Sequence, residues 1–127
     1  MTACLAALKR ALMPLICAFI LAFPLSAQEV TNGPGGVLRA LDKTSGQTVD
    51  IEFRAGEARS YGPLEIVMRE CRYPTANPSG NAFASLQISE RGKDGHIFSG
   101  WMIASAPALS ALEHQRYDVW VIRCNTA

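Results

Sequence analysis

From residue 37 onward, apolar and polar residues alternate in short runs that turn-forming residues separate. In the clearest run, residues 48–54, Val49, Ile51 and Phe53 share one face and the polar residues share the other. A period of two is typical of a β-strand with one buried face. Such runs predict strands over residues 37–41, 48–54, 59–61, 64–71, 82–90, 96–103 and 117–124.

Turn-forming residues predict how these strands connect. Residues 42–47 predict a hairpin between the first two strands. Asp94 and Gly95 predict another hairpin after the strand 82–90, because an Asp-Gly pair favours the left-handed backbone of tight turns. Residues 73–81 contain two prolines and a glycine, and predict a long loop.

Two of the predicted strands, 64–71 and 117–124, end in a cysteine. Simple alternation places Cys71 on the polar face of its strand, so we expect a bulge near Glu70 to turn the thiol inward. The strand 117–124 ends at Cys124 and is apolar on both faces, and we expect it to be a central strand.

Residues 105–114 predict a short helix. Ser105 can cap the first turn, and Pro107 is tolerated inside that turn. Leu109 and Leu112 are three residues apart and share one face of such a helix. A helix of this length is marginal alone, so we expect it to plug one end of the sheets.

The N-terminal residues have the pattern of a secretory leader. Lys9 and Arg10 precede an apolar stretch, Ala11 to Leu25, which is too short to span a bilayer but suits a signal peptide. We expect cleavage before Gln28, and a retained N-terminal anchor is the alternative. The expected organisation is a signal peptide at 1–27, a flexible glycine-rich segment at 28–36 and a single β domain at 37–127.

Charge and cysteine content narrow the function. The chain has 12 basic and 11 acidic residues, and two of the basic ones, Lys9 and Arg10, leave with the leader. No basic stripe remains, which argues against binding of nucleic acid. Cys71 and Cys124 remain beyond the leader and predict a disulfide in an oxidising compartment. Their spacing fits neither a redox C-x-x-C pair nor a zinc site, so we expect no metal and no cofactor.

Together these elements predict an all-β fold with one short helix. We expect a small antiparallel β-sandwich or partly open barrel of about seven strands, closed by one disulfide.

A serine hydrolase is the enzyme class that needs testing. A nucleophile elbow needs glycine two residues before and after the serine, whereas Ser99 has Ile97 and Trp101 there. Triads are defined by geometry rather than by sequence order, so a hydrolase stays a less favoured alternative. The residues available for one are Ser99, Ser105, Ser110, His96, His114, Asp94 and Asp118.

Four residues near the C-terminus form the candidate binding surface: Trp101, His114, Tyr117 and Asp118. His114 would end the predicted helix, where a cationic ring interacts favourably with the helix dipole. Asp118 is the one carboxylate in an apolar strand, and we expect it to be a hydrogen-bonded acid at the strand entrance. Tryptophan in a small β domain usually belongs to the core, but an exposed Trp101, or an exposed Tyr117, could stack a sugar or another flat ligand.

Several segments resemble one bacterial family. They are LRALDK at 38–43, GPLEI at 62–66, REC at 69–71 and, most specifically, FSGWM at 98–102 continuing to Cys124. They are similar to small exported bacterial proteins known as domain of unknown function 2155. Members carry proline after the histidine, where this chain has Gln115.

The resemblance implies an envelope location, paired cysteines and no catalytic residues. Some members are encoded near subunits of respiratory complex I, which implies a periplasmic accessory role. The leading hypothesis is therefore a non-catalytic module that contacts an envelope or inner-membrane protein, with no transmembrane helix after cleavage. A small-ligand or glycan binder is the alternative.

Overall fold

The computed structural model describes residue 24 and residues 27–126, so the predicted signal peptide lies almost entirely outside the described residues. Its cleavage and the alternative of a retained anchor stay predictions. Within the described part of the chain, no helix combines the length and the apolar character that crossing a bilayer requires.

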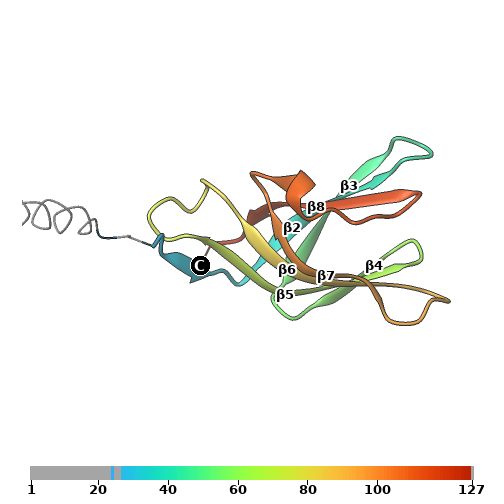
Figure 1. Ribbon diagram of the computed structural model, residues 1–127, viewed down its shortest axis with the longest axis horizontal. Coiled ribbons are helices and arrows are strands. Elements are labelled where there is room, and N and C mark those ends of the chain that lie inside the picture. The colour runs from blue at the N-terminus through green and yellow to red at the C-terminus, as the bar shows by residue number, and fades with distance from the viewer. Residues whose placement is uncertain (1–23, 25–26, 127) are drawn as a thin grey trace, which may run out of the picture.

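The described residues form two antiparallel β-sheets (Figure 1). The larger sheet has five strands in the order β1-β5-β6-β7, with β4 paired to β5 as well, and the smaller sheet has the order β3-β2-β8. The sheets do not close into a barrel, and the all-β prediction is confirmed. The strands are β1 (Val30–Asn32), β2 (Gly35–Asp42), β3 (Thr48–Arg54), β4 (Ala58–Tyr61), β5 (Leu64–Pro74), β6 (Phe83–Glu90), β7 (His96–Ile103) and β8 (Tyr117–Cys124).

The core lies between the facing sides of the two sheets. Ile51 and Phe53 of β3 are buried, as their alternation predicted, and so are Ala84, Leu86 and Ile88 of β6. Each large apolar side chain that is fully buried stabilises the fold by roughly 1.5–3 kcal/mol. The period of two in the sequence thus marks the side of each sheet that faces the other.

The N-terminal segment 28–36 is not the flexible leader that we expected. Val30–Asn32 forms β1, which pairs antiparallel with the end of β5. The glycines after β1 are buried: Gly33, Gly35 and Gly36. A Cβ atom at Gly36 would lie 2.8 Å from Sγ of Cys71 and 2.7 Å from the carbonyl oxygen of Arg123. Close packing, rather than flexibility, requires glycine here.

The predicted loop 73–81 begins later than expected, because β5 continues to Pro74. β1 supplies the pairing partner for these extra residues, with Val30 opposite Pro74 and Asn32 opposite Arg72. Alternation within β5 alone could not show that β1 would pair with its C-terminal end.

Both cysteines reach the core through an irregularity in strand pairing. In β5 the register shifts between Met68 and Glu70, which confirms the predicted bulge. In β8 a shift that we did not predict leaves Ile122 without an opposite residue, so that Cys124 also turns inward. Cys71 and Cys124 form the predicted disulfide, with Cα atoms 5.5 Å apart and a sequence separation of 53. Such a cross-link stabilises a domain by roughly 4 kcal/mol in the chain-entropy account.

The predicted helix at 105–114 is wrong. Only a single 3₁₀ turn forms, at Pro107–Leu109, without a side-chain cap. Ser105 instead exchanges two hydrogen bonds with Asn81: its amide donates to Oδ1, and its hydroxyl accepts from Nδ2. Helix nucleation is unfavourable. The segment is short, has few apolar side chains to bury and lacks its capping residue, so nothing offsets this cost.

The prediction that the strand 117–124 is central is also wrong. β8 lies at an edge of the smaller sheet, and β2 is the central strand. The outward-facing Trp120 and Ile122 are half-buried, whereas Val119 and Val121 face the core and are buried. Apolar residues on both faces of β8 therefore reflect a partly covered outer side rather than a central position.

The two sheets are held together at one end and diverge at the other. Figure 1 shows the N-terminal strand and the C-terminus side by side where the sheets converge, and the hairpin turns at the far end where they separate. The disulfide joins β5 of the larger sheet to β8 of the smaller one at the closed end. We call the end with the hairpin turns the open end of the sandwich.

The packing of Gly36 gives a direct test of the closed end. We expect Gly36→Ala to lower the free energy of unfolding by about 1–3 kcal/mol, the usual cost of overpacking. Chemical denaturation of the oxidised protein measures this change. Gly100→Ala is the matched control. A Cβ atom at Gly100 would lie 3.8 Å from its nearest neighbour, the ring of Phe98, which is an ordinary van der Waals distance. Equal losses in the two variants would contradict the packing role of Gly36.

Candidate functional site

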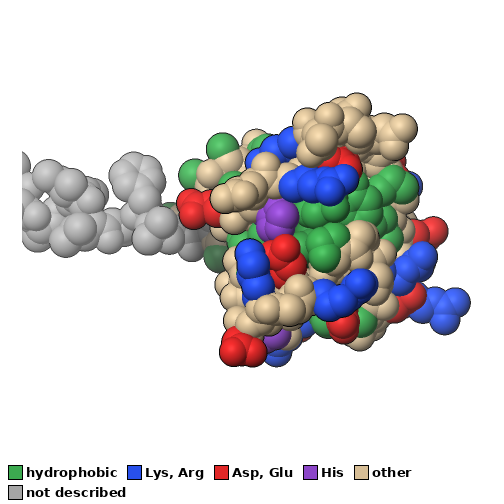
Figure 2. Space-filling model, turned by 90° about the vertical axis from the view of Figure 1, so that its right-hand side faces the viewer, with side chains coloured by type: hydrophobic (Ala, Val, Ile, Leu, Met, Phe, Trp, Pro, Cys, Tyr) green, Lys and Arg blue, Asp and Glu red, His purple; other side chains and the backbone are tan. Residues whose placement is uncertain are grey.

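The open end of the sandwich contains a cleft to which both sheets contribute. Its volume is about 300 Å³. We call it the open-end cleft, and its lining residues are Asp42, Gln47, Thr48, Val49, Tyr61, Gly62 and Tyr117. Figure 2 looks onto this end and shows hydrophobic side chains exposed between rims that carry both basic and acidic side chains.

The apolar part of the cleft includes a core-facing residue, Val49, that stays exposed. Val49 is on the same face of β3 as the buried Ile51 and Phe53 and lies opposite the buried Ala40. Even so, 44% of Val49 is exposed. The sheets diverge at this end, so a position that alternation directs inward is left partly open to solvent. The cleft is thus an unfilled continuation of the core.

Two tyrosines from different sheets close the inner end of the cleft. The rings of Tyr61 and Tyr117 pack edge to face with their centroids 5.3 Å apart. Burial raises the pKa of Tyr61, and the nearby carboxylate of Asp42 acts in the same direction. Gly62, with φ +55°, leaves room for the hydroxyl of Tyr117, which would lie 3.1 Å from a Cβ atom there.

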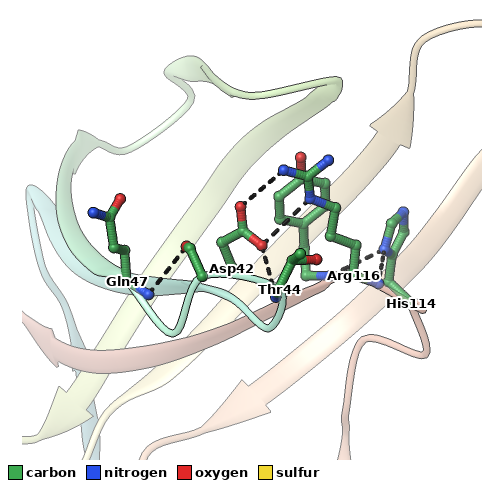
Figure 3. A network of polar contacts seen from close by, with 7 residues as sticks. Asp42, Thr44, Gln47, His114 and Arg116 are labelled. Atoms are coloured by element: carbon green, nitrogen blue, oxygen red, sulfur yellow. Dashed lines mark hydrogen bonds and ion pairs between the residues drawn. The ribbon is translucent and has the colours of Figure 1, made fainter.

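Asp42 lines one wall of the cleft, and Arg116 holds it from outside the cleft through an ion pair (Figure 3). Arg116 donates from Nε to Oδ1 of Asp42 at 3.3 Å and from Nη2 to Oδ2 at 3.1 Å. The guanidinium also lies 5.3 Å from the ring centroid of Tyr117. The hydrogen bonds from Arg116, together with one from the amide of Thr44, lower the pKa of Asp42 against a smaller opposing effect of burial. The carboxylate is therefore held in its charged form.

His114 lies directly behind this wall. Its Nδ1 atom accepts hydrogen bonds from the amides of Arg116, at 3.0 Å, and Tyr117, at 3.1 Å. Its Nε2 atom lies 3.3 Å from Oε2 of Glu90, at the start of the β6–β7 turn. The expected role of a cationic ring at a helix end is therefore wrong, because no helix forms and the ring accepts hydrogen bonds from two backbone amides.

Glu90 connects His114 to the larger sheet. Its Oε2 atom lies 3.0 Å from Nζ of Lys93 as well as near His114. Lys93 first, and then His114, lower the pKa of Glu90. Because Glu90 belongs to the larger sheet and His114 precedes a strand of the smaller one, this contact bridges the diverging sheets.

Asp118 faces away from the cleft and pairs with a lysine. Oδ1 of Asp118 lies 3.3 Å from Nζ of Lys43, which also donates to the carbonyl oxygen of His114 at 2.8 Å. Asp118, near the entrance of β8, thus takes part in an ion pair with a lysine. It supports the segment that leads into the strand.

Trp101 does not belong to this cluster. It lies on the outer side of β7 in the larger sheet, where Arg72 is 4.8 Å from its ring centroid and pairs with Glu70 at 2.8 Å. Trp101 is 39% exposed, whereas Tyr117 is 8% exposed. The structure therefore brings together three of the four candidate residues and separates Trp101. Among the aromatic residues proposed for stacking a flat ligand, Trp101 is the accessible one.

The nearest approach to hydrolase geometry is a pair that the sequence did not single out. Oγ of Ser89 lies 3.1 Å from Nδ1 of His96 on the exposed β6–β7 hairpin. Within residues 27–126, no carboxylate hydrogen-bonds to His96, so the pair lacks the acid of a triad. The same residues contain no cluster of three or more His, Cys, Asp or Glu side chains able to hold a metal ion.

The main residues that sequence reasoning missed are Asp42, Tyr61, Glu90 and Arg116. Asp42 and Arg116 are 74 positions apart, so no local pattern connects them. The inward direction of Val49 was readable from alternation, but its exposure was not. Only the divergence of the sheets turns these residues into a site.

The Asp42–Arg116 pair predicts how stability responds to acid. The pKa of Asp42 is lower in the folded protein than in the unfolded chain. The ionised carboxylate therefore adds to the free energy of unfolding above the unfolded pKa of about 3.9, and this stabilisation is lost as pH falls through the folded pKa. Asp50 and Glu90 have lowered pKa values too and add to the same trend. We expect Asp42→Asn to lower the melting temperature by a few degrees at neutral pH and by less in acid.

Thermal unfolding followed between about pH 7 and pH 3 measures this effect. Asp94→Asn, in the exposed β6–β7 turn, is the control. A melting temperature of Asp42→Asn that runs parallel to that of the unsubstituted protein across the whole range would contradict the prediction.

Comparisons with known proteins agree with the resemblance noted in the sequence. Residues 36–124 match the sequence model of a family described as an uncharacterized protein conserved in bacteria (DUF2155). The chain is 27% identical over 99 residues to the uncharacterized protein RP359 of Rickettsia prowazekii (strain Madrid E), in an alignment that covers 76% of this chain and 64% of that protein. No solved structure shows a significant match. Because the match to the family model extends from β2 to the second cysteine of the disulfide, the chain belongs to this bacterial DUF2155 family.

Proposed function

We propose that the protein is a non-catalytic binding module that contacts another protein of the bacterial cell envelope through its open-end cleft. The observation that carries this proposal is the exposure of core-facing Val49 beside Tyr61 and Tyr117. A cleft that combines apolar side chains with a few polar groups is typical of places where another molecule binds. A side chain from a partner would complete the core that the two sheets leave open.

The residues around the cleft suit a protein partner. Tyrosine and arginine are enriched where protein interfaces contribute most of their binding energy. Here Tyr61, Tyr117 and Arg116 are already held in place by the contacts with Asp42 and His114. Ordering these side chains would therefore cost little free energy when a partner binds.

The disulfide supports an envelope location. Structural disulfides form and persist in oxidising compartments, which in bacteria lie outside the cytoplasm. The pair Cys71–Cys124 and the predicted leader agree with export. The resemblance noted in the sequence makes an inner-membrane respiratory complex the first partner to examine.

Site-specific photo-crosslinking in the native bacterium tests this proposal. A photoreactive amino acid at Val49 is expected to capture one defined envelope protein. The same amino acid at Ser79, an exposed position beside the C-terminal end of β8, is the control and is expected to capture it much less. Equal capture from both positions, or none from Val49, would refute the open-end cleft as the contact surface.

The exposure of Trp101 favours a second candidate, binding of a glycan on the outer face of the larger sheet. Ser85 lies opposite Trp101, and Ser99 lies opposite Gln87, so hydroxyl and amide side chains share this face of the sheet with the ring. If a sugar stacks on the ring, Trp101→Ala should abolish sedimentation with purified cell-wall sacculi, and Trp101→Phe should retain part of it. Failure of the unsubstituted protein to sediment would remove this candidate.

A further inference from the structure

His114 has two ring nitrogens in opposite surroundings. The side chain is 12% exposed. Nδ1 faces two backbone amides, of Arg116 and Tyr117, and Nε2 faces the carboxylate of Glu90. Amides only donate, so Nδ1 must be unprotonated to accept from them. The structure therefore holds a neutral ring with its proton on Nε2, the nitrogen that lies 3.3 Å from Oε2 of Glu90.

The two hydrogen bonds at Nδ1 position the cleft wall. Arg116 carries the guanidinium that pairs with Asp42, and Tyr117 carries the ring that packs on Tyr61. The imidazole of His114 also lies against Tyr117, with ring centroids 5.2 Å apart. His114 is thus a positioning residue for the cleft, although it does not line it.

A second proton on the ring would change this arrangement. A protonated Nδ1 is a donor and would face two other donors. The protonated ring therefore cannot keep the hydrogen bonds from the two amides. On the opposite side the charge of Glu90 attracts the cation, and Lys93 competes for the same carboxylate. The other charged or titratable groups around the ring are Lys43, Glu113, Arg116 and Tyr117.

We propose that His114 is a pH-dependent latch of the open-end cleft. The neutral ring holds residues 114–117 in the conformation that presents Arg116 and Tyr117. The protonated ring stays with Glu90 and releases those amides, which loosens the cleft wall and weakens partner binding in acid. The effect on binding rests on the function proposed above, whereas the exchange of hydrogen bonds does not require a partner.

NMR of the isotope-labelled mature protein tests the latch directly. The chain has two histidines, so His96→Ala leaves the ring of His114 as the single histidine signal. At about pH 8 the ring nitrogens should show the proton on Nε2, and on titration to about pH 5 the amide signals of Arg116 and Tyr117 should follow the ring with one midpoint. A proton on Nδ1 at the higher pH, or amides that do not follow the ring, would overturn the proposal.

His114→Asn separates capping from titration. The oxygen of an asparagine side chain can accept from amides two or three residues further on, and it does not titrate. We expect the amides of Arg116 and Tyr117 to become insensitive to pH in this variant. His114→Ala, which lacks an acceptor, should instead lower the melting temperature. If the asparagine variant does not fold, the titration of the His96→Ala protein still decides the question.

Crosslinking at Val49 then measures the consequence for binding. Capture by the unsubstituted protein should fall several-fold between about pH 7.5 and pH 5.5, and the ratio between the two conditions should be close to one for His114→Asn. An unchanged ratio in the unsubstituted protein would refute control of binding by the latch. Absence of capture at either pH would contradict the proposed function instead, and the NMR titration would still judge the latch.

Discussion

The fold depends on the tight packing of its closed end around the disulfide. Cys71 and Cys124 join the two sheets, and Gly36 passes so close to Sγ of Cys71 that a methyl group would not fit. A small domain with a limited core gains a large part of its marginal stability from such a cross-link. Because the sheets are fastened at this end, the twist of each sheet carries them apart toward the hairpin turns.

The open-end cleft is a consequence of that divergence. Side chains that would meet in the middle of the sandwich no longer reach each other, and Val49 is left exposed on a core-facing position. Contacts that bridge the two sheets include the packing of Tyr61 on Tyr117 and the contact of His114 with Glu90. Surface ion pairs contribute little stability individually, so the Asp42–Arg116 pair matters chiefly because it orients the wall of the cleft.

Sequence reasoning identified Tyr117, His114 and Asp118 as candidates but placed His114 at the end of a helix that does not form. The leucine spacing and the possible Ser105 cap that predicted this helix are local features. The side chain of Asn81, more than twenty residues away, takes the hydrogen bonds of Ser105. Asp42 was missed as the partner of Arg116 for the same reason, because the two residues are 74 positions apart in the sequence. Trp101 was grouped with the others because an exposed aromatic ring can stack a flat ligand, but it belongs to the other sheet.

The sequence by itself determined the strands β2 to β8, the bulge before Cys71, the disulfide and the family, because alternation, turn residues and cysteine number are local or compositional properties. Only the tertiary structure decided that the N-terminal glycines are packed rather than flexible, that β8 is an edge strand, and that the core stays open at one end. Those properties depend on which segments meet across the two sheets. The alternation of residues along a strand says which side is buried, but not what lies opposite.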